Sequence, residues 1–599
     1  MLTDETKYQQ RIAQLEREVA DLKAKLTAKQ KATRYGLVWE DVPEAFEQEA
    51  ENKIPILEEV KDKAIKNDDG KPTHILIEGD NYHALQCLNY THRGKVDVIY
   101  IDPPYNTGAT DGQDPFIYRD KRVLEKYPNG TTVPKDSPLR HSYWLSFMSK
   151  RLELAKNLLS PNGVIFISID DNEQANLKLL CDKIFKSDSY QATLHIQVRY
   201  ADKSLTEEKP FKPLMEYVLV YSKPDYIPKR EIEDYSVEKF CYKITELSEG
   251  YKFNSNGQDV ILFRKNEWKI EKVESSLIGL KETWITGSIY TKMSYGKVFQ
   301  TIIEPRIDVD GLNCLYKVIG RGDDGLGYRY YTGPAKKTAR FGKMFSGIPL
   351  DKLEEIKNGF APKRLLPIVT MYDYAADFGN IRTEGGVPYN SGKKPIKMLS
   401  QLIELHCNKD AIVLDFFAGS ASTLHATLTS NERDKGNRQC ILIQCNEKNI
   451  CEEVAYKRCE NVMNKLGNSL KYYRTAFVGD HDAATATDED KVVLAHKAGC
   501  LIAIAENTLE EVEANNTYQI FQDGTRYTAV YFSGNLVDMP EFTEKVESLR
   551  NSSRLTKIEV YIYCLGNVQQ FENEFDSLHR INLHAIPQPI IEIYKQLNA

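Results

Sequence analysis

The chain lacks any long uninterrupted apolar segment. Across its 599 residues no hydrophobic run approaches the length needed to span a bilayer. The first residues also lack a signal-peptide pattern, because Met1 to Lys7 leads straight into a polar helical pattern. We therefore expect neither a membrane span nor a secretory signal, and we interpret the protein as cytoplasmic.

The cysteines show none of the spacings that are typical of disulfide frameworks or zinc-binding motifs. The 11 cysteines are scattered, their number is odd, and no two form a Cys-x-x-Cys pair. This excludes a disulfide framework and a structural zinc site, and it favours reduced thiols. No metal site is expected. Hydrophobic residues at 41% and charged residues at 28% are typical of a globular protein, and the length predicts several domains.

An overall excess of basic charge is also missing, since the formal net charge is −7. The charge is unevenly distributed, however. Residues 1–70 carry net −4, residues 480–599 carry net −10, and residues 71–479 carry 58 basic and 51 acidic side chains, net +7. The central region therefore has the sign that phosphate binding needs. The acidic C-terminal region is expected either to meet a protein partner or to be a solvated surface.

The most informative motif is Asp102-Pro103-Pro104-Tyr105. It follows the β-branched run 96–101, which predicts a strand, so the motif falls at the carboxyl end where open α/β sheets place their chemistry. Two prolines fix two φ angles and remove two backbone donors. The stiff loop presents acceptors and one aromatic ring, a set that suits a planar base with an exocyclic amine. Taken alone, the motif could also be an ordinary turn.

A second motif follows the apolar stretch 411–414, which predicts a buried strand. A loop of small residues comes next, and residues 424–428 look helical. Gly419 allows close approach of a ligand, and amides at the helix start would face an anionic group. Strand, Gly/Ser loop and helix are typical of a nucleotide-type cofactor site, although a plain turn would have the same pattern.

Together the two motifs, in this order, resemble the β-class of amino-methyltransferases that act on DNA. The resemblance implies an α/β, Rossmann-like and circularly permuted fold that uses S-adenosyl-L-methionine (AdoMet). Catalysis is then expected at Asp102, Pro103, Pro104 and Tyr105. Ala421 stands where the family often has a second glycine.

Other segments extend this resemblance. Residues 76–81 match an element in which Asp80 would lie near the AdoMet adenine, and residues 393–399 match a Lys-Pro segment before the AdoMet strand. The ribose-binding acid of many relatives aligns with Gln444, with Glu447 three residues on. The cofactor-binding residues implied are Asp80, Lys394, Asp415, Phe417, Gly419, Ser420, Ser422, Thr423 and Glu447.

The overall plan resembles the modification (Mod) subunit of type III restriction–modification systems. It implies an N-terminal helical or coiled-coil region with a connector at 1–70, a catalytic half at 71–224, a target-recognition insert at 225–386, an AdoMet half at 387–479 and an α+β C-terminal domain at 480–599. It also implies double-stranded DNA as substrate, a homodimer, and a helicase–nuclease (Res) partner that docks on the C-terminal domain.

Two regions outside the core carry further patterns. Residues from Tyr8 to Leu26 follow a heptad spacing, which predicts either pairing with a second chain or one helix packed on its own domain. The insert holds a basic and aromatic cluster that would contact DNA, or else form a solvated hairpin. The DNA-binding candidates are Tyr328, Arg329, Lys336, Lys337, Arg340 and Lys343.

The expected reaction is methyl transfer to the N6 amine of a flipped adenine. Asp102 and the Pro103 carbonyl would accept the amine hydrogens, and Tyr105 would stack on the base. Adenine is favoured because cytosine-N4 relatives more often carry Ser in place of Asp102. The alternatives are a solitary adenine-N6 or cytosine-N4 methyltransferase without a nuclease partner, and a non-catalytic DNA-recognition subunit.

Overall fold

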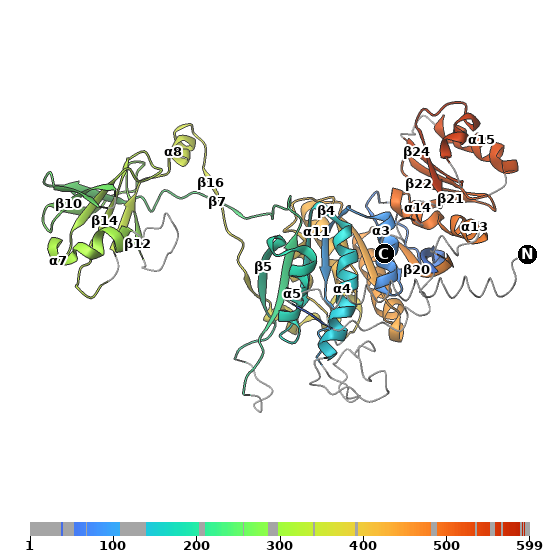
Figure 1. Ribbon diagram of the computed structural model, residues 1–599, viewed down its shortest axis with the longest axis horizontal. Coiled ribbons are helices and arrows are strands. Elements are labelled where there is room, and N and C mark those ends of the chain that lie inside the picture. The colour runs from blue at the N-terminus through green and yellow to red at the C-terminus, as the bar shows by residue number, and fades with distance from the viewer. Residues whose placement is uncertain are drawn as a thin grey trace, which may run out of the picture. The chain divides into compact units, whose positions relative to one another are not determined.

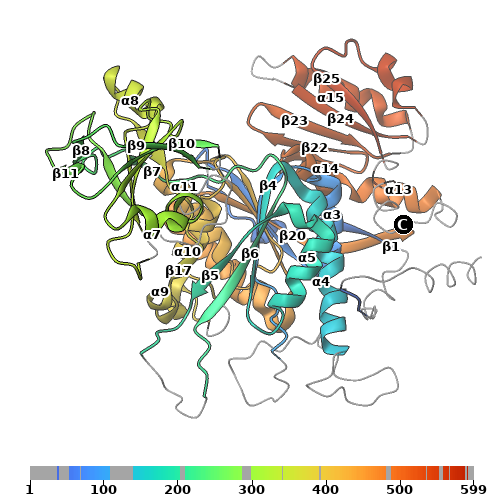
Figure 2. The ribbon, with the colours of Figure 1, turned by 60° about the vertical axis from the view of Figure 1, so that its left-hand side comes forward.

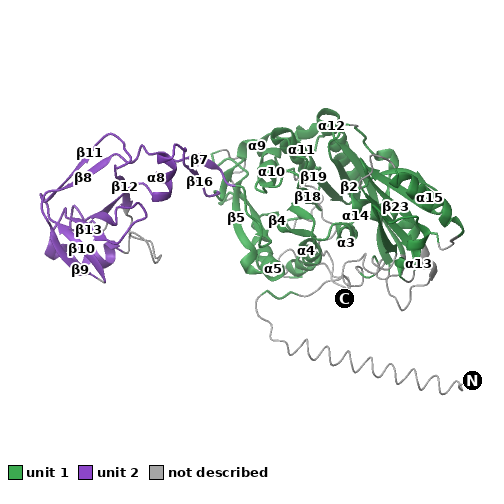
Figure 3. Ribbon diagram, turned by 90° about the horizontal axis from the view of Figure 1, so that it is seen from above, with its two compact units in different colours: residues 1–229, 369–599 green, residues 230–368 purple. Residues whose placement is uncertain are grey.

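A computed structural model describes most of the chain between residues 37 and 592. The described residues are 37–39, 53–67, 69–107, 139–202, 210–255, 257–285, 298–339, 342–389, 393–480, 488–533, 536–551, 557–564, 567–586, 590 and 592. They form two compact units, one of residues 1–229 with 369–599 and one of residues 230–368 (Figure 3). The heptad segment from Tyr8 to Leu26 lies outside the described residues.

A ten-stranded sheet forms the centre of the first unit. Its strands, in spatial order, are β1 (Lys53–Glu59), β20 (Ser469–Asp480), β2 (Thr73–Glu78), β19 (Gln439–Gln444), β18 (Ile412–Asp415), β3 (Val96–Ile101), β4 (Leu159–Ile169), β6 (Met215–Ser222), β5 (Tyr190–Gln197) and β17 (Met371–Asp373). From β20 to β4 all neighbours pair in parallel, and β6 then runs antiparallel to β4 and β5.

The order of these strands has a direct consequence for the two motifs. Strand β18, from the second half of the sequence, lies between β3 and β19, and it pairs in parallel with both. The register aligns Val413 with Val98 and Leu414 with Ile99. Residues 102 and 415, more than 300 positions apart, therefore follow neighbouring strands at one edge of the sheet. The expected permuted α/β fold is confirmed.

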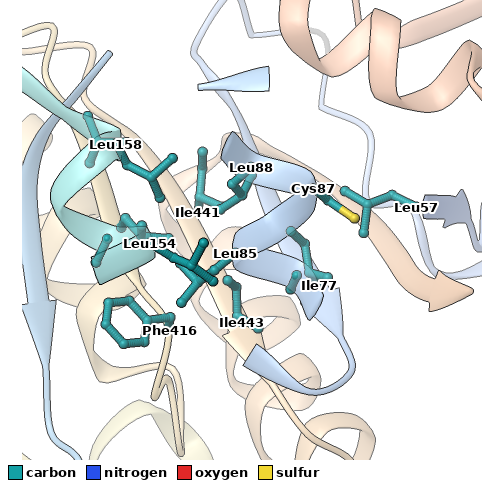
Figure 4. Packing of buried hydrophobic residues seen from close by; sticks show 14 of the residues in the cluster. Leu57, Ile77, Leu85, Cys87, Leu88, Leu154, Leu158, Phe416, Ile441 and Ile443 are labelled. Atoms are coloured by element: carbon teal, nitrogen blue, oxygen red, sulfur yellow. The ribbon is translucent and has the colours of Figure 1, made fainter. Parts of the chain in front are cut away.

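Helices cover both faces of this sheet, as parallel strands buried on both sides require. Strand residues alternate between the faces: Ile77 and Ile99 pack with one set of helices, and Leu76 and Val98 with the other. One set is α3 (Asn81–Thr91), α4 (Leu139–Leu158) and α5 (Gln174–Phe185), and the other is α10 (Ile396–Ile403), α11 (Ser422–Asp434) and α12 (Lys457–Leu466). Figure 1 shows α4 and α5 lying along the sheet, and Figure 4 shows the interlocking of α3, α4 and strand residues such as Leu85, Leu154 and Ile443.

The second unit is built mainly from antiparallel strands. Its six-stranded sheet runs β12 (Lys281–Ile285), β15 (Gly342–Ser346), β14 (Tyr328–Thr332), β13 (Leu315–Ile319), β10 (Gln258–Phe263) and β9 (Tyr251–Ser255). One face packs on the π-helical turn Phe299–Ile303, and the other on the two-stranded antiparallel sheet of β8 (Tyr242–Glu246) and β11 (Trp268–Lys272). β7 (Ile232–Asp234), β16 (Lys363–Leu365), α7 (Ile307–Asp310) and α8 (Leu350–Lys357) complete it. Residues 369–386 of the predicted insert group with the first unit instead, because β17 pairs with β5.

The C-terminal residues of the first unit form a five-stranded sheet. Its strands, in spatial order, are β21 (Glu510–Ala514), β22 (Tyr518–Asp523), β23 (Arg526–Tyr531), β24 (Lys557–Tyr563) and β25 (Ile581–Ile586). Helix α15 (Met539–Arg550) packs on this sheet through an apolar cluster separate from that of the central sheet. Between this sheet and the core lie α13 (Asp488–Lys497) and α14 (Gly499–Glu506). Helix α14 contacts α3, β1 and β23, so it joins the two sheets (Figure 2).

The structure also bears on the expectations for disulfides and for membrane spans. All 11 cysteines are free thiols, seven of them buried, so they act as small apolar side chains in the packing. Among the described residues, no helix combines the length and the apolar character needed to cross a membrane.

Candidate functional site

The Asp-Pro-Pro-Tyr loop begins directly after β3, all six residues of which are buried. Pairing with β18 on one side and β4 on the other fixes the end of this strand. Trp144 of α4 donates its indole N–H to the Pro104 carbonyl at 2.7 Å. That bond and the two fixed proline φ angles hold the loop, so Asp102 and Tyr105 stand in defined positions at the edge of the sheet.

A buried carboxylate anchors the far end of this loop. The side chain of Glu173 is fully buried and accepts from Asn106 Nδ2 at 2.5 Å and from Asn176 Nδ2 at 2.8 Å. His141 Nδ1 lies 2.6 Å from the same carboxylate. Asn106 itself has φ of +56°, a conformation that asparagine tolerates better than most residues. Glu173 thus ties the loop to the starts of α4 and α5.

Three polar side chains gather around Asp102. The Tyr105 hydroxyl lies 2.7 Å from Asp102 Oδ1 and 3.2 Å from Glu216 Oε2. Lys394 Nζ donates to the Tyr105 hydroxyl at 2.7 Å and to Glu216 Oε2 at 2.6 Å, and it lies 3.3 Å from Asp102 Oδ1. The side chain of Lys394 is only 7% exposed. We call Asp102, Tyr105, Glu216 and Lys394 the Asp102 cluster.

Burial sets the electrostatics of the Asp102 cluster. Burial and the neighbouring Glu216 charge raise the pKa of Asp102, against the lowering effect of Lys394. Burial would lower the pKa of Lys394, but the two carboxylates outweigh it and raise that pKa. The ammonium is therefore held in its charged form between two carboxylates.

The loop after β18 is organised by Asp415. Its Oδ1 accepts from the Phe417 N–H at 2.9 Å, and its Oδ2 accepts from the Thr423 hydroxyl at 2.5 Å. Burial raises the pKa of Asp415 to about 7. Behind the loop, the buried Arg458 donates to the hydroxyls of Ser422 at 2.8 Å and Ser420 at 3.2 Å. The predicted loop residues are thus bound into one network around the start of α11.

Two residues of this loop adopt left-handed backbone conformations. Gly419 has φ of +52° and Ala421 has φ of +58°. A Cβ built on Gly419 would meet only the Phe417 carbonyl oxygen, at 3.8 Å, so the backbone faces open space there. The Gly419 N–H donates to Gln444 Oε1 at 2.6 Å. The backbone of Gly419 is therefore accessible to a ligand, while Ala421 takes up strain that a glycine would avoid.

Asp80 lies close to this loop through a second network. It caps α3 by accepting from the Tyr82 N–H at 2.8 Å, and it pairs with Arg151 Nη2 at 3.2 Å. The guanidinium of Arg151 lies over the Phe147 ring at 3.7 Å. Asn81 Nδ2 donates to the Phe416 carbonyl at 2.9 Å, which joins the start of α3 to the loop after β18.

The remaining predicted cofactor residues fall in two places. Glu447 begins the turn Glu447–Asn449 after β19 and is half-buried. Lys394 lies instead in the Asp102 cluster, while its neighbour Lys393 donates to the backbone carbonyls of Arg382, Glu384 and Val387. The roles of Glu447 and Lys394 toward AdoMet stay predictions.

The predicted DNA-binding residues with described positions belong to the second unit. Lys337 is 78% exposed, and Lys343 lies 4.8 Å from the ring of the exposed Trp284. Lys336 is also exposed, and Tyr328 is half-buried beneath Lys317. Arg329, in contrast, is buried and paired with Asp323 and Asp324, so its charge is used within the fold. Arg340 lies outside the described residues.

Sequence reasoning missed several residues that build the site. Glu216 and Arg458 contact the two motifs, Glu173 holds Asn106 next to the first motif, and Arg151 bonds to Asp80 and Asn81. All four lie far in sequence from these side chains. Glu216 is the second residue of the largely apolar strand β6, and only the antiparallel pairing of β6 with β4 brings it near Asp102. The one available signal was a charged residue inside a strand pattern, which seldom occurs without a partner.

Comparisons with known proteins agree on one family. A family described as DNA methylase matches residues 96–457. The StyLTI Mod subunit, a type III restriction-modification enzyme of Salmonella typhimurium, is 29% identical over 435 residues, covering 70% of this chain and 60% of that protein. The type II methyltransferase M.KpnI of Klebsiella pneumoniae is 29% identical over 384 residues, covering 63% of this chain and 82% of that protein.

These matches differ in how far they reach. The chain spans about 60% of the length of the Mod subunits it matches. Among solved structures, a putative DNA modification methylase of Thermus thermophilus complexed with S-adenosyl-L-methionine is 12% identical, covering 67% of this chain and 98% of that one, with a TM-score of 0.29. The DNA methylase match covers well over half of the chain, and the protein therefore belongs to the DNA methylase family.

Proposed function

We propose that this protein transfers a methyl group from AdoMet to the N6 amine of adenine in DNA. The observation that carries the proposal is the pairing of β3 with β18. It puts the Asp-Pro-Pro-Tyr loop and the Asp415–Thr423 loop after neighbouring strands at the same edge of the sheet. A base held by the first loop would be adjacent to a cofactor held by the second.

The residues present fit AdoMet. The backbone of Gly419 faces open space. Asp415 bonds to Phe417 and Thr423 in the same loop, and Arg458 bonds to Ser420 and Ser422. Asp80 reaches the same edge of the sheet from β2, and Glu447 follows β19. When bound, AdoMet would supply an electrophilic methyl group on a sulfonium, which is already a good leaving group.

The chain's own contribution is to hold the amine. Among the described residues, both contacts to the Asp102 carboxylate are made at Oδ1, so Oδ2 remains to accept an amine hydrogen. With the Pro103 carbonyl as the second acceptor, the nitrogen lone pair would be localised toward the methyl group. In a duplex the base must first be flipped out, and the Tyr105 ring would stack on it.

The second unit, residues 230–368, is the proposed reader of the DNA sequence. Lys336 and Lys337 are exposed, and Trp284 beside Lys343 offers an exposed ring. Such groups bind phosphates and stack on bases. Lys337 and Lys343 are each paired with one carboxylate, Asp308 at 3.6 Å and Glu282 at 2.8 Å. Arg329 is left out of this interface because it is buried and paired with two carboxylates, Asp323 and Asp324.

We further propose that the protein acts as the modification subunit of a type III system. The support is the similarity to Mod subunits, which spans 70% of this chain in the StyLTI case. In this proposal the protein is a homodimer, and the acidic C-terminal sheet docks a helicase–nuclease subunit. A reading frame for such a subunit beside this gene would add support.

A second candidate is a solitary methyltransferase with no nuclease partner. The match to M.KpnI, a type II methyltransferase, covers 82% of that protein and favours this alternative. Co-purification separates the two candidates: a type III modification subunit brings a helicase–nuclease chain with it from its own host, and a solitary enzyme does not.

The direct test of the proposed class is methyl incorporation. Purified protein is incubated with AdoMet labelled in its methyl group and with DNA from a host that lacks the gene. We expect label in the DNA and none when the DNA is omitted. Tight DNA binding without any incorporation would identify a non-catalytic DNA-recognition subunit instead.

A further inference from the structure

The lysine and the glutamate of the Asp102 cluster come from elements far from the catalytic loop. Lys394 precedes α10, and Glu216 is the second residue of β6. Both side chains are largely buried, with 7% and 19% exposure. Neither follows from the Asp-Pro-Pro-Tyr motif itself, and Glu216 carries no expectation from the sequence.

The ammonium of Lys394 contacts three oxygens of the Asp102 cluster. It donates to the Tyr105 hydroxyl and to Glu216, and it lies 3.3 Å from Asp102 Oδ1. Two of its three N–H groups therefore have hydrogen-bond acceptors in the catalytic loop and Glu216, and the charge lies within ion-pair distance of Asp102. In this arrangement the lysine faces the catalytic loop.

The Tyr105 hydroxyl links the members of the cluster. It carries a single proton, which it donates to Asp102 Oδ1, the nearer of its two carboxylate neighbours, while accepting from Lys394. Lys394 Nζ also lies 5.0 Å from the centre of the Tyr105 ring. The orientation of the ring that would stack on a base is thus coupled to the position of the lysine.

Asp102 offers both oxygens as acceptors, and the stronger charge-assisted hydrogen bond, only in its ionised form. The charged and titratable groups that face it are Lys394, Glu216, Tyr105, Tyr100 of β3 and Asp415 after β18. Burial and Glu216 raise the pKa of Asp102, and Lys394 lowers it. Lys394 is the one cation in this set, so it opposes the effects that would protonate the carboxylate.

We propose that Lys394 and Glu216 are positioning residues. Lys394 keeps Asp102 ionised and the Tyr105 ring in place. Glu216 holds Lys394, but its own negative charge acts on Asp102 in the opposite direction. This inference rests on the proposed methyl transfer and deepens it. It also assigns Lys394 to the catalytic loop rather than to AdoMet.

The test is the pH dependence of kcat for methyl transfer in wild type, Lys394→Met and Glu216→Gln. Removing the lysine removes the group that lowers the pKa of Asp102, so the acid limb should move at least about one unit to higher pH. Removing the glutamate charge removes a group that raises the pKa, so the limb should move to lower pH. Shifts of opposite sign are not what a general loss of folding produces.

Two further variants serve as controls. Lys394→Arg keeps the charge and should leave the acid limb closer to wild type than Lys394→Met does. Lys397→Met removes an exposed lysine three residues away and should leave the limb unchanged. For all variants the AdoMet dissociation constant, measured by calorimetry, should stay within about twofold of wild type, since a tenfold change would equal a lost binding interaction.

Two results with the Lys394→Met variant would overturn the inference. An acid limb in Lys394→Met that coincides with wild type would refute the electrostatic role. A tenfold weaker AdoMet affinity in that variant would return the lysine to the cofactor site. If wild-type protein transfers no methyl group at all, the proposed function itself fails. In that case a double-mutant cycle of Lys394→Met and Asp102→Asn, followed by thermal melting, decides whether the two charges are coupled, and additive effects would sink the cluster.

Discussion

Tyr105 has two separable parts, a ring and a hydroxyl that contacts Asp102. Base–aromatic stacking contributes about 1–3 kcal/mol, and a hydrogen bond to a charged group contributes about 1.5–3 kcal/mol. Tyr105→Ala loses both contributions and should lower kcat/KM by about 100-fold or more, whereas Tyr105→Phe keeps the ring and should lower it less. Steady-state kinetics on DNA checks this order. Equal losses in both variants would contradict the stacking role.

At Gly419 a side chain is disfavoured by the backbone conformation and not by a lack of space. Its φ of +52° costs an ordinary residue about 1–2 kcal/mol, and a β-branched residue is the least tolerant. Gly419→Val should raise the AdoMet dissociation constant about tenfold or more. Gly419→Asn is the matched control, because asparagine visits this conformation readily. Unchanged affinity in a folded valine variant would show that the loop does not hold AdoMet.

Helix α14 is apolar on all sides because it is packed between two layers. Leu501, Ile502 and Ile504 are buried, at about 1.5–3 kcal/mol each, which is comparable with the roughly 5–15 kcal/mol that stabilises a typical domain. A truncated protein ending at Gly479, which also cuts β20 short, should melt well below one ending at Asn507. Equal melting temperatures would show that α14 is dispensable to the core.

The shorter and longer truncations also separate two roles of the C-terminal region. The protein ending at Asn507 keeps α14 and loses the five-stranded sheet. It should still bind AdoMet and methylate DNA but should no longer co-purify with a helicase–nuclease subunit. Retained co-purification would place the docking surface elsewhere, and loss of methylation in a folded protein would make the sheet part of the catalytic unit.

Local patterns were sufficient to predict the strands and loops that carry both motifs. Strand β3 and the loop after β18 follow from β-branched runs and small residues that are adjacent in sequence. The contacts between elements were not predictable in this way. Arg329 was predicted to bind DNA because it lies in a basic and aromatic segment of the insert. In the structure it is buried and paired with Asp323 and Asp324 of the preceding turn. Lys394 and Glu216 meet only because β6 enters the sheet antiparallel beside β4.

The predicted homodimer concerns the whole molecule and a segment outside the described residues. The heptad positions Tyr8, Ile12, Leu15, Val19, Leu22 and Leu26 would give about three heptads, which is marginal for a free coiled coil. Light scattering at micromolar concentration should give the mass of a dimer. A monomer mass would refute the dimer, and a dimer that survives deletion of residues 1–30 would refute only the role of this helix.

The charge distribution supports DNA binding by the central part of the chain and protein binding by the C-terminal part. Residues 71–479 carry net +7 and contain both loops and the proposed DNA-reading unit, whereas residues 480–599 carry net −10. A protein that binds DNA through the basic part should lose affinity steeply as salt rises. The acidic part would meet DNA unfavourably, which is consistent with a protein partner there.

The measurement that tests the central claim most directly is the identity of the methylated nucleoside. DNA incubated with AdoMet and either wild-type protein or Asp102→Ala is digested and its nucleosides are analysed by mass spectrometry. We predict N6-methyldeoxyadenosine with the wild type and a loss of at least about 10³-fold with Asp102→Ala, whose AdoMet affinity stays near normal. N4-methyldeoxycytidine as the product, or near-normal turnover by Asp102→Ala, would contradict the account.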